Sequence, residues 1–190
     1  MRSIFNVAAL RTHEPQLSFT MESLENLNDL FLHELRDLYD AEQQLTKALP
    51  LLAQAAKSEQ LRTSFQTHLE ETKEQARRLE QIFKAAGVPA EGKPCKAMAG
   101  LIAEAKELLD HDADPEVLDA ALIVAAQKVE HYEIAGYGSV STFARVLGYH
   151  DAAKLLKQTI AEEERTDKKL TQLSEQLNSK AATADQAANT

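Results

Sequence analysis

The sequence predicts an all-α protein of one domain, built as a bundle of four long helices. The 190 residues are rich in Ala, Leu, Glu, Lys and Gln, which favour helix in nearly every window. Aromatic residues make up only 5% of the chain, and runs of Val, Ile, Thr and aromatics typical of strands are missing. Long segments repeat apolar residues at steps of three and four, which is the period of an amphipathic helix.

The first helix is predicted to begin at Ser23, whose hydroxyl can accept from a free backbone N–H. Glu42 occupies a gap in its apolar face, where the period would place a core residue. Pro50 is expected to bend or locally break the helix, with residues 51–56 continuing beyond it. The apolar face consists of Leu27, Phe31, Leu35, Leu38, Leu45 and Leu49.

The second helix is predicted from Ser58 to the stop signals Gly87 and Pro89. His68 and Glu71 lie beside its apolar face, three residues apart and therefore on one side of the helix. Because the turn before Ser58 is short, the first two helices should be antiparallel neighbours. The apolar face consists of Leu61, Phe65, Leu69, Thr72, Ala76, Leu79 and Phe83.

Residues 90–114 form a long connection with one modest helical pattern, from Cys95 to Leu109. A connection of this length suits a crossover between two helical hairpins better than a simple turn.

The third long helix is predicted from Asp114-Pro115-Glu116, a strong start signal, to about residue 146. Residues 118–143 are apolar around nearly the whole helix, which indicates a core helix. Glu130 and Glu133 nevertheless stand in its middle.

The fourth helix is predicted from about residue 151 to residue 177, with Glu163 and Asp167 filling a gap in its apolar face. Residues 179–190 show no apolar period, so we expect a disordered tail. Residues 1–20 are expected to be a poorly ordered extension, or to reflect an upstream start codon. The bundle itself is predicted to span residues 21–178.

Charge and composition exclude several classes of function. The net charge of −9 argues against nucleic acids and anionic membranes as partners. No apolar run approaches the ~20 residues that span a bilayer. The single cysteine, Cys95, cannot form a disulfide within the chain, which suits a cytoplasmic protein. No phosphate-binding glycine loop or nucleophile elbow is present.

Acidic residues at core positions on several helices predict a metal site. Carboxylates are rarely buried unless they are paired or bind a metal, and one cation pair can neutralise several of them. The candidate ligands are Glu42, His68, Glu71, Glu130, Glu133, Glu163 and Asp167. Glu70, His131 and Glu164 are neighbours that a shift of one helical step would select instead.

Taken singly, these residues have ordinary explanations. A lone Glu42 is typical of a bundle edge whose carboxylate reaches solvent, and a lone His68 is typical of a hydrogen-bonded core histidine. Residues 162–164 alone are typical of a solvated acidic face. The coincidence on four helices favours the metal site. Tyr39, Tyr132 and Tyr137 are interpreted as packing residues, with contacts to the site as the alternative.

Four segments in order, FLHELRDLYDAEQQL, HLEETKEQARRLEQIF, AQKVEHYEIAGYG and EEERTDKKL, resemble the YciE/YciF family of bacterial ferritin-like proteins. The resemblance implies a ferritin-like bundle with an extra short helix, usually dimeric, linked with stress and carrying a rubrerythrin-like di-metal site. The family has no firmly assigned reaction. The sequence departs from the ferritin-type Glu-x-x-His pattern, since His68 precedes Glu71 and Asp167 stands where a histidine would help.

The sequence is compatible with two function classes and does not decide whether the protein is an enzyme. The first is a di-metal oxidoreductase that reduces peroxide or oxygen at an iron or manganese pair during stress. The second is a non-enzymatic homodimeric stress protein whose acids are residual or bind metal structurally. Iron storage would require a hollow cage, and the family resemblance favours a small oligomer. No catalytic residue is assigned.

Overall fold

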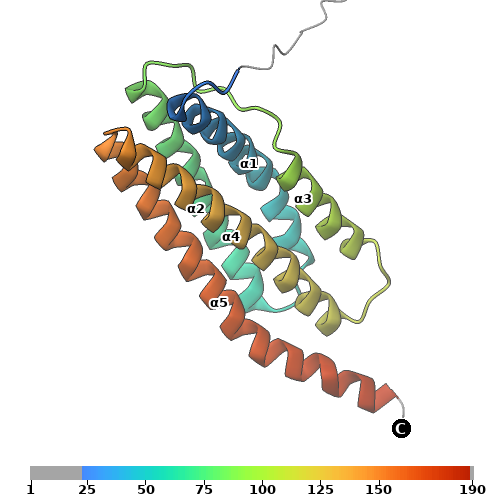
Figure 1. Ribbon diagram of the computed structural model, residues 1–190. Coiled ribbons are helices and arrows are strands. Elements are labelled where there is room, and N and C mark those ends of the chain that lie inside the picture. Colours follow the sequence, from blue (N-terminus) through green and yellow to red (C-terminus); the bar gives the residue numbers. More distant parts are fainter. Residues whose placement is uncertain (1–22, 189–190) are drawn as a thin grey trace, which may run out of the picture.

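A computed structural model describes residues 23–188 of the chain, and its side chains as far as residue 182. The described part contains five α-helices and no strand, which confirms the predicted all-α bundle (Figure 1). The helices are α1 (Leu27–Ala55), α2 (Glu59–Ala85), α3 (Lys96–Leu109), α4 (Pro115–Val146) and α5 (His150–Ala188). Among these residues, no helix is both long and apolar enough to cross a lipid bilayer.

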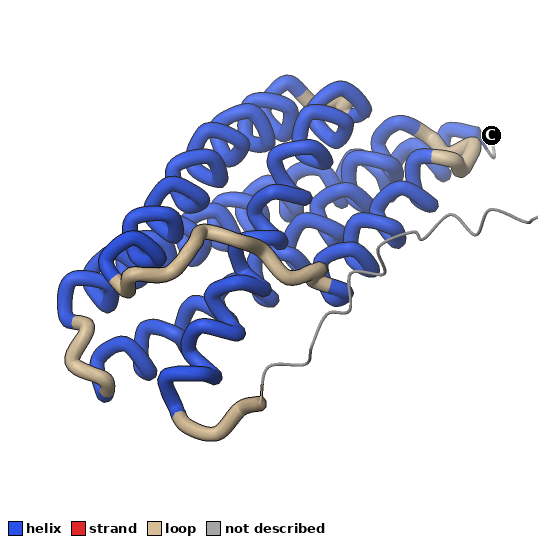
Figure 2. Tube along the Cα trace, turned by 90° about the horizontal axis from the view of Figure 1, so that it is seen from above, coloured by secondary structure: helices blue, strands red, loops and turns tan. Residues whose placement is uncertain are grey.

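The four long helices form two hairpins, α1–α2 and α4–α5, that pack against each other (Figures 1 and 2). Helix α1 also contacts α4, and α2 contacts α5, so each long helix touches two others around a shared interior. The short helix α3 contacts α1 and α4 and covers the side of the bundle between them. The long segment between α2 and α4 is therefore the crossover that its length predicts.

Side-chain caps define most helix starts. Ser58 caps α2, with its hydroxyl accepting from the Leu61 N–H at 3.5 Å, and Asp114 caps α4 through the Glu116 N–H at 2.9 Å. Both agree with the sequence. The prediction for α1 was wrong: the cap is Asn26, because Ser23 instead donates to the Glu25 carboxylate.

Glycine conformation explains where α2 and α4 end, and solvent exposure explains why α1 continues through a proline. Gly87 and Gly148 adopt positive φ angles of 72° and 83°, the left-handed conformation that ends α2 and α4. Helix α1 continues through Pro50 to Ala55 without the predicted break. Pro50 faces solvent, where water can satisfy the carbonyl group that its missing N–H leaves free.

Helix α5 continues to Ala188, past the end that the sequence predicts near residue 177. Leu177 is its last buried residue among the side chains described, and residues 178–182 are partly or fully exposed. The Ala-rich sequence after Ser179 contains no Gly or Pro, and its helical propensity explains the continuation. The predicted extension of residues 1–20 lies outside the described residues, and the domain limits at 21 and 178 stay predictions.

The apolar core consists of two clusters. One contains Leu45, Leu49, Phe65, Leu122 and Leu170, and the other contains Phe31, Leu35, Phe83, Tyr137 and Leu156, each with further members. Between them along each long helix lie buried polar residues. This polar layer is formed by Glu42, His68, Gln75, Glu130, Glu133 and Glu163.

The connection between α1 and α2 is held by Asp119 of α4. Its buried carboxylate accepts from the backbone N–H groups of Lys57 and Ser58, each at 2.8 Å.

Asp119→Ala should lower the free energy of unfolding by about 2 kcal/mol, because two backbone donors lose a charged acceptor. Denaturant unfolding measures this, with the exposed Asp112→Ala as the control. Equal losses in both variants would show that the contact contributes nothing specific.

Candidate metal centre

Four side chains from three helices converge in the polar layer: His68 of α2, Glu130 and Glu133 of α4, and Glu163 of α5. One potential ligand atom from each lies within 4.8 Å of all the others. The exposed fractions are 3% for His68, 1% for Glu130 and Glu133, and 0% for Glu163. This is the carboxylate-rich cluster with a histidine that the sequence predicts.

One edge of the His68 ring faces two acids of the cluster. Its Nε2 is 3.3 Å from Glu130 Oε1 and 3.8 Å from Glu163 Oε2. On the other edge of the ring, Nδ1 is 3.8 Å from Glu71 Oε2. The ring therefore presents one nitrogen to the acids of α4 and α5, as a metal-binding histidine must.

Helix α1 adds a fourth carboxylate, Glu42, which is 0% exposed and next to Glu133. The Tyr137 hydroxyl donates to Glu42 Oε1, so this tyrosine contacts the site instead of serving only as packing. Burial, together with the charges of Glu42 and Glu133, raises the pKa of Tyr137 well above its ordinary value. The phenol thus stays protonated and fixes the orientation of Glu42.

Gln75 of α2 is a site residue that was not predicted from the sequence. Its amide donates to Glu163 Oε1 and, at 3.2 Å, to Glu162 Oε2. Arg78 binds the same Glu162 through two nitrogens, at 2.5 and 2.7 Å. Gln75 lies seven residues after His68 and so on the same face of α2, which was the available signal.

The four carboxyl groups carry a strong electrostatic cost when ionised together. Burial is the largest cause and raises the pKa of Glu42, Glu130 and Glu133 well above the ordinary value. The charges of neighbouring acids raise all three further. Burial also raises the pKa of Glu163, although His68 opposes this shift. The protein alone therefore does not supply enough positive charge to balance these acids.

Several buried atoms of the cluster have no hydrogen-bond partner among the described residues. These atoms are Glu42 Oε2, both ring nitrogens of His68, Gln75 Oε1, Glu130 Oε2, Glu133 Oε2 and Glu163 Oε2. Buried polar atoms without partners are rare and costly. Carboxylate oxygens and imidazole nitrogens are the ligands that iron and manganese accept. The residues present therefore fit a bound metal pair.

Two predicted ligands, Glu71 and Asp167, do not join the group. Glu71 is partly exposed, between His68 and Arg165, and its pKa is lowered mainly by its interaction with His68. Asp167 accepts from Gln127 at 3.0 Å and faces the exposed His131 at 3.4 Å. Both carboxylates border the cluster on its solvent side.

Cys95 lies apart from these acids. It caps α3, and its Sγ is 3.0 Å from the Tyr132 hydroxyl, which donates to Asp37. Burial raises the pKa of the Cys95 thiol. A raised pKa disfavours the reactive thiolate, in keeping with a structural cysteine.

Comparison with known proteins places the chain in a family. Residues 26–183 match the family described as Domain of unknown function (DUF892). Protein YciF of Escherichia coli (strain K12) is 50% identical over 152 residues, which cover 80% of this chain and 92% of YciF.

Solved structures agree with the sequence comparison. The crystal structure of the E. coli stress protein YciF superposes with a TM-score of 0.80 at 49% identity, covering 82% of this chain and 99% of that one. YcfI from Rhodopseudomonas palustris gives 0.78 at 44% identity, covering 80% and 98%.

A dodecameric thioferritin from Bacteroides fragilis shares the fold alone. It has a TM-score of 0.59 at 17% identity, covering 85% of this chain and 91% of that one. The ferritin-like architecture predicted from the sequence is thereby confirmed. The chain belongs to the DUF892 family and is a relative of YciF, as the resemblance of its four motifs predicts.

Proposed function

We propose that this protein binds two divalent metal ions, iron or manganese, and reduces dioxygen or peroxide with them during stress. The observation that carries the proposal is the cluster of buried acids with unpaired oxygens. Four ionised carboxylates, those of Glu42, Glu130, Glu133 and Glu163, have the charge that two divalent cations neutralise. A single cation would leave two buried negative charges unbalanced.

Different side chains of the site would bind the metals and position the ligands. Glu130, Glu133, Glu163 and Glu42 would hold the metals, and His68 would supply the nitrogen ligand. Tyr137 and Gln75 hold Glu42 and Glu163 in place through hydrogen bonds. A bound pair of iron(II) or manganese(II) ions supplies two electrons, the number that converts peroxide and two protons to water, or dioxygen and two protons to peroxide.

The biological setting rests on the relatives. YciF is described as a stress protein, which supports a role in stress for this chain. A cytoplasmic location remains a prediction from the sequence. In the non-enzymatic alternative the acids are residual or bind metal structurally, and no turnover is expected. Measuring dioxygen and peroxide consumption by protein treated with iron(II) or manganese(II) distinguishes the two.

Metal content tests the centre directly. Wild-type protein loaded with iron(II) or manganese(II) and then desalted should retain about two ions per chain by elemental analysis. Glu130→Gln should reduce this to one or none, because an amide cannot supply the negative charge. The matched control is Glu164→Gln, which removes an exposed acid next to Glu163 and should bind as wild type does. Equal metal content in all three proteins would refute the assignment.

The pH dependence of stability gives a second test on metal-free protein. A carboxyl whose pKa is raised on folding stabilises the protein below its unfolded pKa, ~4.3 for Glu, and loses this effect as pH rises through the folded value. At pH 7, Glu130→Gln should therefore have a higher melting temperature than wild type, and a free energy of unfolding greater by on the order of 1–3 kcal/mol. Both differences should shrink toward pH 4.

Metal should reverse this order. Divalent ions bind the ionised, folded site, so they should raise the melting temperature of wild type at pH 7 and leave Glu130→Gln nearly unchanged. Glu164→Gln should follow wild type throughout. A difference between wild type and Glu130→Gln that does not vary with pH would mean that Glu130 is solvated.

Assembly is a separate proposal. We expect a homodimer, on the basis of the family resemblance and of apolar side chains left exposed on α4. Val117 and Val124 are 47% and 55% exposed and lie two turns apart on one face. Light scattering at micromolar concentration should report twice the chain mass of 21.0 kDa. A monomer, or a cage-sized particle, would contradict it.

A further inference from the structure

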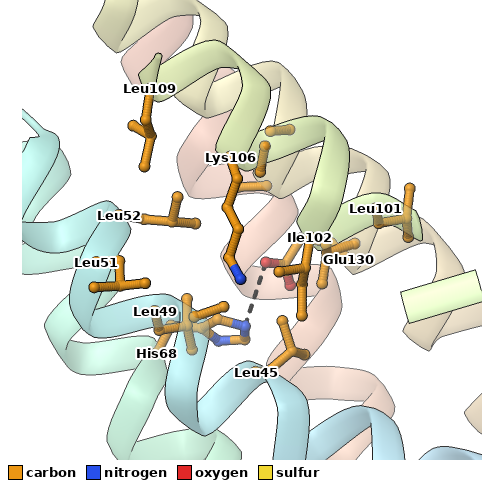
Figure 3. A pocket seen from close by; sticks show the side chains of 15 residues that line it. Leu45, Leu49, Leu51, Leu52, His68, Leu101, Ile102, Lys106, Leu109 and Glu130 are labelled. Carbon is orange, nitrogen blue, oxygen red and sulfur yellow. Dashed lines mark ion pairs between the residues drawn. The ribbon is translucent and has the colours of Figure 1, made fainter. Parts of the chain in front are cut away.

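A small cavity lies against the metal centre, between α1, α3 and α4 (Figure 3). Its volume is about 30 Å³. At its inner end are two residues of the centre, His68 and Glu130, which are almost fully buried and carry nitrogen and oxygen atoms without hydrogen-bond partners. At its outer end are the exposed side chains of Leu51 and Lys106. The cavity thus lies between the surface beside α3 and the centre.

The walls of the cavity are apolar between these two ends. Leu45 and Leu49 come from α1, Ile102 and Ala105 from α3, and Val129 from α4. None of these side chains offers a hydrogen-bond donor or acceptor. A molecule passing through must therefore give up hydrogen bonds to water without replacement, at a cost of about 1–3 kcal/mol for each polar group.

The size of the cavity restricts its occupant further. A cavity of ~10–15 Å³ holds one water molecule, so this cavity accepts one or two molecules of that size. Organic substrates are too large. Metal cations are disfavoured by the apolar wall and by the Lys106 ammonium at the outer end. Hydrogen peroxide is small enough but strongly hydrated, whereas dioxygen is both small and apolar.

We propose that this cavity binds dioxygen and delivers it to the centre at His68 and Glu130. The inference rests on the proposed function, since it identifies dioxygen as the substrate of that site. It gives α3 a function within the fold: the helix supplies the outer wall of an apolar route. Hydrogen peroxide and the metal ions would reach the centre by other paths.

The test narrows the cavity by substitution. Ala105 is buried in its wall, and Ala105→Val and Ala105→Leu fill it progressively. The matched control is Ala103→Leu, an exposed position of the same helix that does not line the cavity. Each protein is first loaded with iron(II), and its metal content and melting temperature are measured. The graded pair keeps the test valid if the larger side chain impairs folding.

Nitric oxide is the probe, because it is an uncharged diatomic molecule like dioxygen and its binding to iron(II) is followed by absorbance in a stopped-flow instrument. The association rate should fall at least tenfold in Ala105→Leu and by a smaller factor in Ala105→Val, and stay within twofold of wild type in Ala103→Leu. Oxidation of the iron by hydrogen peroxide should change less than twofold in all variants. Xenon-pressurised crystals of metal-free wild type should contain xenon in the cavity, and those of Ala105→Leu should not.

The outcomes separate the two proposals. Wild-type protein that retains no iron(II) overturns the metal centre and the dioxygen route with it. Full iron content with equal nitric oxide rates in Ala105→Leu and Ala103→Leu overturns the route alone. Peroxide oxidation that slows as much as nitric oxide binding shows a general access path and refutes the selectivity for dioxygen.

Discussion

The burial of four carboxylates at one level of a helical bundle is the constraint on which the rest of the structure depends. Like charges in a poorly solvated interior repel, and each must also give up its hydration. Among the described residues, His68 and two hydrogen-bond donors lie against the four acids, and the nearby Arg78 is paired with Glu162. The fold therefore forms a site that requires positive charge from outside the chain. The two apolar clusters, one on each side of this layer, supply the stability that the layer itself does not.

The two sides of the polar layer differ in chemistry. Between α2 and α5, Arg78, Glu162 and Gln75 form a hydrogen-bonded network that ends on Glu163, and Glu71 borders it near solvent. On the side of the cavity, the side chains of α1 and α4 that face His68 and Glu130 are aliphatic, and α3 covers them. His68 stands between these regions, with Nδ1 toward Glu71 and Nε2 toward Glu130. One face of the centre is thus polar and acidic, and the opposite face is apolar.

Much of this arrangement could be predicted from the sequence, because helix period and capping are local properties. The gaps in the apolar faces identified Glu42 and Glu163, and the core character of α4 identified Glu130 and Glu133. The positions of Glu71 and Asp167 relative to the cluster were harder to predict. Neighbouring positions on a helix differ by about 100°, and periodicity alone does not resolve whether a residue at the edge of a face points inward. Tyr137 and Gln75 were not assigned as site residues because their contacts cross between helices, to Glu42 and Glu163, and depend on packing that no local pattern contains.

The departure from the ferritin-type Glu-x-x-His pattern has a physical consequence. The histidine of α2 lies on the apolar side of the layer, where it forms part of the cavity wall together with Glu130. An imidazole can occupy that position more easily than a carboxylate, because it is neutral when it binds metal and costs less to bury. Gln75 then occupies the α2 position next to Glu163, where an uncharged amide donates a hydrogen bond without adding a fifth negative charge. With His68 and Gln75 at these two positions, the site keeps four acids, which is the number that two divalent ions balance.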